Sequence, residues 1–176
     1  GSATTIDVDN CFDDTTYAFY MIRWDGIVLS ESGGDPVHFR LLDASGSAIT
    51  DDEYISAIAY HYYGTGASSG NALRVAVGEI GYVDLLAGNI NYYTDADPYY
   101  VFHGAMWLNG VQSTSYRPQG QWICNCDNAA GTEFYWNSGN FNYSDTAIAH
   151  RGISFFSNGG YTLLNTGKVA VYGYKM

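Results

Sequence analysis

The sequence predicts an all-β protein, an antiparallel β-sandwich of about ten short strands. The 176 residues include 17 tyrosines and 21 glycines; tyrosine favours strands, and glycine punctuates them. Only 14% of the residues are charged, against about a quarter in typical soluble domains. Aromatic-rich segments recur between clusters of Gly, Asn, Ser and Asp, and none has the spacing of a convincing helix. Together these features favour a sandwich or a barrel.

The expected strands follow from these segments in order along the chain. The first covers residues 17–27, which are rich in Tyr, Phe, Ile and Trp, and a Ser-Gly-Gly-Asp-Pro turn follows it. The second covers 37–42, where Val37, Phe39 and Leu41 occupy alternate positions and are expected to point inward. Further strands are expected at 53–62, 72–77, 82–92, 99–108, 120–126, 132–137, 151–156 and 168–175.

The first strand carries bulky side chains on both of its faces. One face holds Tyr17, Phe19 and Met21, and the other holds Tyr20, Ile22 and Trp24. A sheet with one side in water needs bulk on one face only. We therefore expect the second face to be covered, either by another part of the same chain or by a neighbouring subunit.

The length of the chain fits one domain, residues 1–176, which buries roughly two-thirds of its unfolded surface without disulfides or metal. The sequence begins with Gly1-Ser2 rather than with an initiator Met, and these two residues are interpreted as a cloning remnant. The sequence contains no apolar run of about 18 residues and no segment patterned like a signal peptide. We expect neither a membrane span nor a signal peptide.

Charge and cysteine content exclude two classes of protein. The sequence has 7 Lys and Arg residues against 18 Asp and Glu residues, which gives a formal net charge of −11. This charge repels nucleic-acid phosphates. The three cysteines cannot all pair with one another, so we do not expect a disulfide framework. We expect assembly in a reducing compartment instead. Cys124 and Cys126 are two apart and would face one side of a strand as buried thiols.

Both ends of the chain resemble a known family. The closing stretch runs from His150 through Ser157-Asn158-Gly159 to Tyr172-Gly173-Tyr174, and the opening runs from Thr5 to Phe12, then Tyr17 and Tyr20. With Phe39-Arg40-Leu41-Leu42-Asp43 between them, these segments are similar to bacteriophage tail-fibre and capsid-surface domains of the β-sandwich type. The similarity fades from about Tyr60 to Asn128.

This resemblance implies a jelly-roll-like sandwich, trimeric on a fibre or spike, at the surface of a virion assembled in the bacterial cytoplasm. The function it implies is receptor binding by the C-terminal domain of a tail fibre that adheres to host glycans or other surface receptors. The alternatives are a capsid decoration protein without a ligand and, less favoured, a glycan-degrading enzyme. We expect no enzyme activity and no cofactor.

The middle of the chain holds the first candidate sugar contacts. Asp95 and Asp97 lie in an Asp-Ala-Asp-Pro turn, preceded by Tyr92 and Tyr93 and followed by two further tyrosines. Aromatic rings stack on the apolar face of a pyranose, and carboxylates accept hydrogen bonds from its hydroxyls. The same segment also fits an ordinary turn with solvated acids. Paired carboxylates serve glycoside hydrolysis only at a separation of about 5 to 9.5 Å.

Two further groups are candidate receptor contacts. Trp136 and Asn140 flank a segment read as an amide-rich turn, and Tyr116 precedes Arg117, whose guanidinium can bind a carboxylate or a sulfate. For Trp136, burial in the core is favoured over a receptor contact, because Phe134 shares its strand face.

Other motifs are given structural interpretations. Ser68 lies in a Gly-x-Ser-x-Gly string, but its flanks do not predict the strand and helix of a nucleophile elbow, so a loop is expected. The aspartates near the N-terminus lack EF-hand spacing, which favours a solvated acidic segment over calcium. The four histidines lie on separate segments and are expected to be structural. No catalytic set or metal site is predicted.

Overall fold

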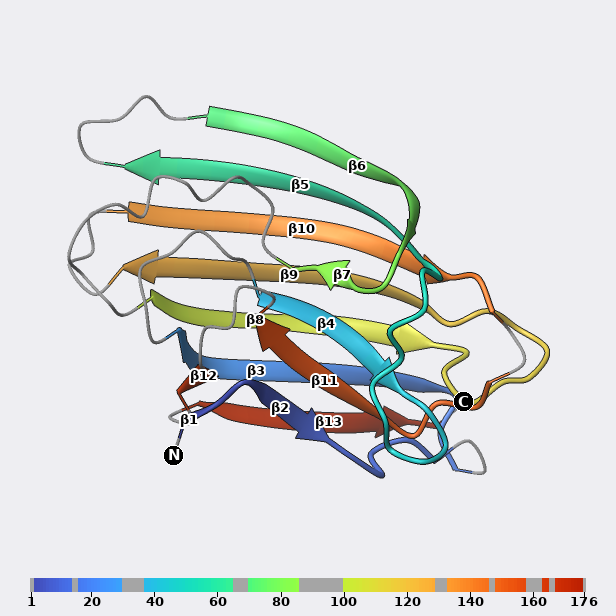
Figure 1. Ribbon diagram of the computed structural model, residues 1–176. Helices are drawn as coiled ribbons and strands as arrows, with labels where there is room; N and C mark the ends of the chain where they lie inside the picture. Colours follow the sequence, from blue (N-terminus) through green and yellow to red (C-terminus); the bar gives the residue numbers. More distant parts are fainter. Residues whose placement is uncertain are drawn as a thin grey trace.

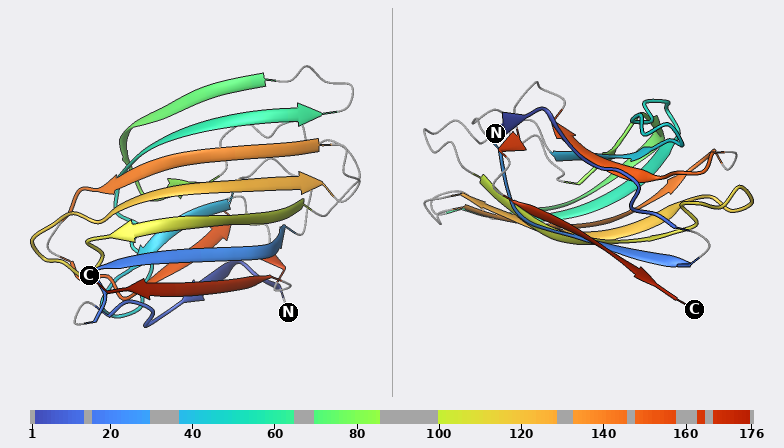
Figure 2. Two further views of the ribbon diagram at one scale, coloured as in Figure 1. Left: turned by 180° about the vertical axis from the view of Figure 1, so that it is seen from behind. Right: turned by 90° about the horizontal axis from the view of Figure 1, so that it is seen from below.

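The computed structural model describes residues 2–13, 16–29, 37–64, 70–85, 100–128, 133–145, 148–157, 163–164 and 167–175. Two antiparallel β-sheets pack face to face, and the larger one curves around the smaller (Figures 1 and 2). The predicted β-sandwich is therefore confirmed. Within the described part there are thirteen strands, ten of which have four residues or more.

The large sheet has the order β1–β12–β3–β8–β9–β10–β5–β6, and β13 also pairs with β3. Its strands are β1 (Ser2–Ala3), β3 (Phe19–Leu29), β5 (Tyr54–Gly64), β6 (Gly70–Ile80), β8 (Tyr100–Asn109), β9 (Gln119–Asn128), β10 (Glu133–Tyr143), β12 (Leu163–Leu164) and β13 (Lys168–Tyr174). The small sheet has the order β2–β11–β4–β7. Its strands are β2 (Thr5–Val8), β4 (Val37–Leu42), β7 (Val83–Asp84) and β11 (Gly152–Ser157).

Most predicted strands agree with the structure to within two or three residues, and the differences fall at four places. Of the strand predicted at 82–92, the described residues 82–85 contain the two-residue β7, and residues 86–92 lie outside the described part. The strand predicted at 132–137 continues to Tyr143. The two-residue strands β1 and β12, which pair with each other, and the four-residue strand β2 were not among the expected strands. Segments this short have too few residues to display a period-two pattern.

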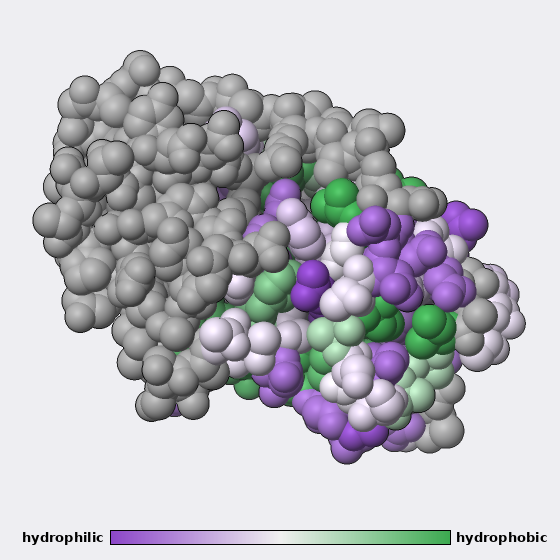
Figure 3. Space-filling view, viewed as in Figure 1, coloured by the Kyte–Doolittle hydropathy of each residue, from purple (hydrophilic) through white to green (hydrophobic). Residues whose placement is uncertain are grey.

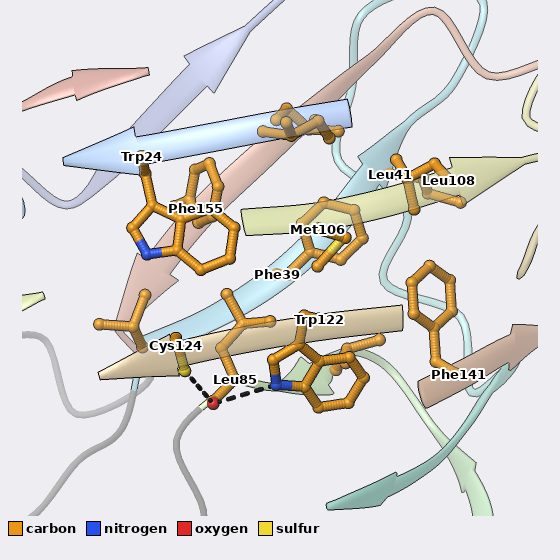
Figure 4. Packing of buried hydrophobic residues seen from close by; sticks show 14 of the residues in the cluster. Trp24, Phe39, Leu41, Leu85, Met106, Leu108, Trp122, Cys124, Phe141 and Phe155 are labelled. Carbon is orange, nitrogen blue, oxygen red and sulfur yellow. Dashed lines mark hydrogen bonds between the residues drawn. The ribbon is translucent and has the colours of Figure 1, made fainter. Parts of the chain in front are cut away.

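The core lies between the two sheets and is rich in large rings (Figure 4). Val37, Phe39 and Leu41 are fully buried, as their alternation predicts. They share the core with Trp24 of β3, and the ring of Trp24 lies 5.4 Å from the ring of Phe155 on β11. The inner face of β3 is thus covered by the small sheet of the same chain. One of the two bulky faces of this strand is therefore accounted for.

Trp122 on β9 is held in this core by a hydrogen bond and by close packing. It is 2% exposed, and its indole Nε1 donates a hydrogen bond to the Leu85 carbonyl oxygen at 3.3 Å (Figure 4). The ring lies over Gly139 of the neighbouring β10, where an added Cβ would stand 2.3 Å from Trp122 Cζ2. A glycine is needed at that position because the indole fills the space that a side chain would take.

The three cysteines are free thiols, and Cys124 and Cys126 are buried on the same face of β9, as predicted. Cys124 Sγ lies 3.1 Å from the Leu85 carbonyl oxygen. Burial raises the pKa of both thiols far above the ordinary value, and it raises the pKa of Cys11 to about 12. These groups therefore remain protonated and unreactive at neutral pH.

The acidic N-terminal segment contributes an ion pair to the sandwich. Asp9 Oδ1 and Oδ2 accept hydrogen bonds from Arg151 Nε and Nη2, both at 2.5 Å. The guanidinium of Arg151 lowers the pKa of Asp9. This carboxylate is thus occupied by an arginine next to β11. No helix in the described residues has the length and apolar character needed to span a membrane.

His150 gives the fold a predicted dependence on pH. Its ring is fully buried against Tyr143, with ring centroids 5.0 Å apart, and neither ring nitrogen has a hydrogen-bond partner in the described part of the chain. Desolvation lowers the pKa of His150 from 6.5 to about 4. Because the unfolded chain takes up this proton below about pH 6.5 and the folded chain only below about pH 4, stability is lost as the pH falls through that window.

We expect this histidine to contribute on the order of 2 kcal/mol to the loss of stability between pH 7 and pH 4.5. The measurement is urea unfolding at both pH values for the wild type and for His150→Gln, with His61→Gln as a control because His61 is exposed. The difference between the two pH values should shrink in His150→Gln and not in the control. An equal pH dependence in all three proteins would show that His150 is not the group responsible.

Candidate ligand-binding face

The outer face of the large sheet carries the candidate site (Figure 2, left). Successive residues of a strand point to opposite faces, so the neighbours of the core residues point away from the small sheet. On the opposite side of the molecule, polar and apolar residues are intermixed over the described surface (Figure 3). The outer face of the large sheet also exposes residues of both kinds, and the pairing of neighbouring strands brings some of them into groups.

One group consists of five exposed amides and a tryptophan on three neighbouring strands, and we call this set the amide face. Its members are Trp107 and Asn109 on β8, Gln119 and Gln121 on β9, and Asn140 and Asn142 on β10. The strand register arranges them in two rows. Trp107 pairs with Gln121, which pairs with Asn140; one row further, Asn109 pairs with Gln119, which pairs with Asn142.

The amide face surrounds a hollow of about 350 Å³, with the ring of Phe19 on β3 at one side. The indole of Trp107 is 37% exposed. Three neighbouring strands place the outer columns about 10 Å apart. No side-chain hydrogen bond to another described residue occupies the five amides. Their donors and acceptors are therefore open to a ligand.

These side chains suit a neutral ligand that carries many hydroxyl groups. Each amide offers a carbonyl acceptor and an NH₂ donor side by side, which matches the paired donor and acceptor roles of neighbouring hydroxyls. The indole offers an apolar surface on which a sugar ring can stack. All six residues are uncharged, so the amide face does not by itself select a charged ligand.

A second hollow, of about 800 Å³, continues from the first over the end of the sheet. Asn109 and Gln119 line both hollows. The connection between β8 and β9 forms its rim, where Tyr116 is 75% exposed and Arg117 is exposed. Ser113 Oγ holds this connection in place by accepting a hydrogen bond from the backbone N–H of Tyr116 at 2.9 Å. The two predicted contacts on this loop therefore lie beside the amide face.

The segment around Trp136 and Asn140 differs from the prediction. It is not a turn but part of β10, paired with β9 and β5 along its length. Trp136 and Phe134 share a strand face, as predicted, but it is the outer one. Phe134 is 42% exposed, and Trp136 is half-buried against the ring of His61, 5.1 Å away. The expected burial of Trp136 in the core is thus wrong, because Tyr135 takes the core position.

The structure brings Asn140, Tyr116 and Arg117 to one continuous surface and places Trp136 in a separate hollow farther along the strands. The candidates Tyr92, Tyr93, Asp95 and Asp97 lie outside the described residues, as does Ser68.

Sequence reasoning missed Trp107 and the amides other than Asn140. The signal that could have found them is the spacing of two, with Gln119 and Gln121 around Gly120 and with Asn140 and Asn142 around Phe141. Amides at alternate positions beside core-facing residues indicate a polar strand face.

No family model matches the chain, and a comparison with curated proteins finds no matching relative.

Proposed function

We propose that this chain is a glycan-binding adhesion domain and that the amide face is its binding platform. The observation that carries the proposal is the uncharged set of amides on three adjacent strands, arranged beside an exposed indole. Exposed amides and aromatic rings with this spacing have no role in the core. They match the alternating hydroxyl groups and apolar ring faces of a sugar.

Binding is favoured over hydrolysis by the residues that line the two hollows. Glycoside hydrolysis needs an acid and a second carboxylate on either side of the scissile bond. Among the described residues that line these hollows there is no Asp or Glu. The chemistry available is therefore that of recognition.

The resemblance of both chain ends to bacteriophage surface domains supplies the biological setting of the proposal. In that setting the domain is the receptor-binding end of a tail fibre on the virion surface, and its partner is a host surface glycan. A glycan array and adsorption to host cells test it together. Binding to arrayed glycans and to cells is the expected result. Binding to empty capsids and to no glycan would contradict it and favour a capsid decoration protein.

We also propose that the chain forms a trimer, as the resemblance implies, through a surface separate from the amide face. Tyr172 and Tyr174 on β13 are 46% and 45% exposed, and they lie on the outer face opposite Met21 and Phe19 of β3. The Tyr174 ring covers part of Phe19, with centroids 5.4 Å apart. This aromatic group adjoins the amide face but consists of different strands. It is the part of the outer face that a neighbouring subunit would bury.

Tyr172→Lys is expected to shift the trimer toward monomer, because it places a charge in a surface that the subunits would bury. Sedimentation velocity at micromolar concentration measures the mass. Ile55→Lys is the matched control, since Ile55 is 40% exposed on the same sheet face near its other edge. The trimer proposal fails if the wild-type chain sediments as a monomer, or if both variants behave alike.

A further inference from the structure

A third hollow, of about 410 Å³, lies on the same outer face, next to the amide face. Arg23 and Asp25 of β3 border it on one side, and Trp136 of β10 lies on the other. Between them, Ala105 of β8 is the strand partner of Arg23. The small side chain of Ala105 leaves the space that makes the hollow.

The polar side chains that line this hollow are those of Arg23, His103 and Asn125, together with one carboxylate, Asp25, that is already engaged by His103. Asp25 Oδ1 lies 2.5 Å from His103 Nδ1, and the backbone N–H of Gly26 lies 3.3 Å from the same ring nitrogen. This pair fixes the imidazole ring and leaves its Nε2 edge on the side away from the carboxylate. Asn125 adds an amide in the next strand, at the position opposite His103.

Arg23 is the group that points to a ligand. It is exposed at the edge of the hollow, and no ion pair or hydrogen bond to another described residue occupies its guanidinium. By contrast, Arg40 donates to the Gly81 carbonyl oxygen and Arg151 is paired with Asp9. Lys168 stands opposite Asp25 on the adjacent β13. In a chain with only seven Lys and Arg and a net charge of −11, Arg23 lines this hollow, and Lys168 lies on the adjacent strand outside its lining.

We propose that this hollow is a second sugar subsite that binds a carboxylate-bearing sugar, and this inference rests on the proposed glycan-binding function. The planar guanidinium of Arg23 matches a carboxylate with two parallel hydrogen bonds. The half-exposed ring of Trp136 offers a stacking surface on the other side of the hollow.

The position of the two sites sets the kind of ligand. His103 and Asn125 lie four residues along their strands from Trp107 and Gln121, a separation of about 13 Å. A ligand that reaches both sites is therefore an oligosaccharide that lies along the strands. Neutral units would occupy the amide face, and an acidic unit would occupy the Arg23 hollow.

The test compares acidic oligosaccharides with their neutral counterparts by calorimetric titration of the full chain. Suitable probes are sialyllactose against lactose and trigalacturonate against its carboxyl-reduced form, with a sulfated trisaccharide to distinguish carboxylate from sulfate recognition. The wild type is expected to bind the acidic member of a pair at least tenfold more tightly. Arg23→Gln should remove that preference and leave the neutral affinity unchanged. Lys175→Gln, the same change of charge at an exposed position outside the hollow, should retain it.

The outcomes separate this inference from the proposed function. Equal binding of acidic and neutral members by the wild type overturns the acidic subsite and leaves the glycan-binding proposal standing. The same holds if Arg23→Gln and Lys175→Gln have equal effects, or if the sulfated sugar binds and the carboxylated ones do not. If the folded wild type binds neither member of any pair and no arrayed glycan, both proposals fail.

Discussion

Trp107→Ala is expected to weaken glycan binding by at least tenfold and to leave the fold intact. The indole stands on the outer face of β8, at one side of the amide face, and aromatic anchors of this kind carry a large share of binding energy. The change removes the stacking surface without opening a cavity in the core, because the ring is on the solvent side of the sheet. Calorimetric titration with a glycan selected on the array measures the affinity.

Phe134→Ala is the control for this prediction. Phe134 is 42% exposed on the outer face of β10 and lines none of the three hollows described above. Its removal should change neither affinity nor the circular dichroism spectrum. If Trp107→Ala binds like the wild type, or if the two variants lose affinity equally, the amide face is not the platform.

Trp122→Ala is expected to destabilise the protein by about 3 to 5 kcal/mol, the range observed when a buried tryptophan is truncated. Trp122 is buried, and its ring fills the space over Gly139. The change also removes the hydrogen bond that the Trp122 indole N–H donates to the Leu85 carbonyl oxygen. The loss includes both the packing and this hydrogen bond. Urea unfolding followed by tryptophan fluorescence and by circular dichroism gives the free energy of unfolding.

Trp107→Ala serves as the stability control for this second prediction. Trp107 and Trp122 lie on adjacent strands but on opposite faces of the sheet, so the same substitution separates a core role from a surface role. We expect Trp107→Ala to cost less than about 1 kcal/mol. A similar loss of stability in both variants would mean that the faces of the sheet are wrongly assigned.

The strands of this fold were predictable because their pattern is local. The alternation of Val37, Phe39 and Leu41 gave β4 the bounds that the structure has. The burial of His38 beside them was not predictable. It depends on Asp84, whose Oδ1 lies 2.8 Å from His38 Nδ1, and on the ring of Tyr82, 4.3 Å away. Asp84 and Tyr82 are more than 40 residues from His38 in the sequence, and the pairing of β7 with β4 brings them beside it.

The candidate site was predictable only in part, for a similar reason. Asn140 was identified as a contact, although on the basis of a turn that does not exist. Its neighbour Gln121 is 19 residues away in the sequence, and only the register of β9 with β10 brings the two together. Composition could indicate that amides and aromatic rings are abundant. It could not show that five amides and Trp107 project from the same face.

The most direct test of the account is to locate a bound glycan on the sheet by NMR. The protein, labelled with ¹⁵N, is titrated with a glycan selected on the array, and the shifts of the Trp107 indole N–H and of the Asn and Gln side-chain amides are followed. The account predicts that the largest shifts belong to Trp107, Gln121 and Asn140, and that the buried indole of Trp122 changes little. Saturable shifts confined to the small sheet, with the amide face unchanged, would contradict it.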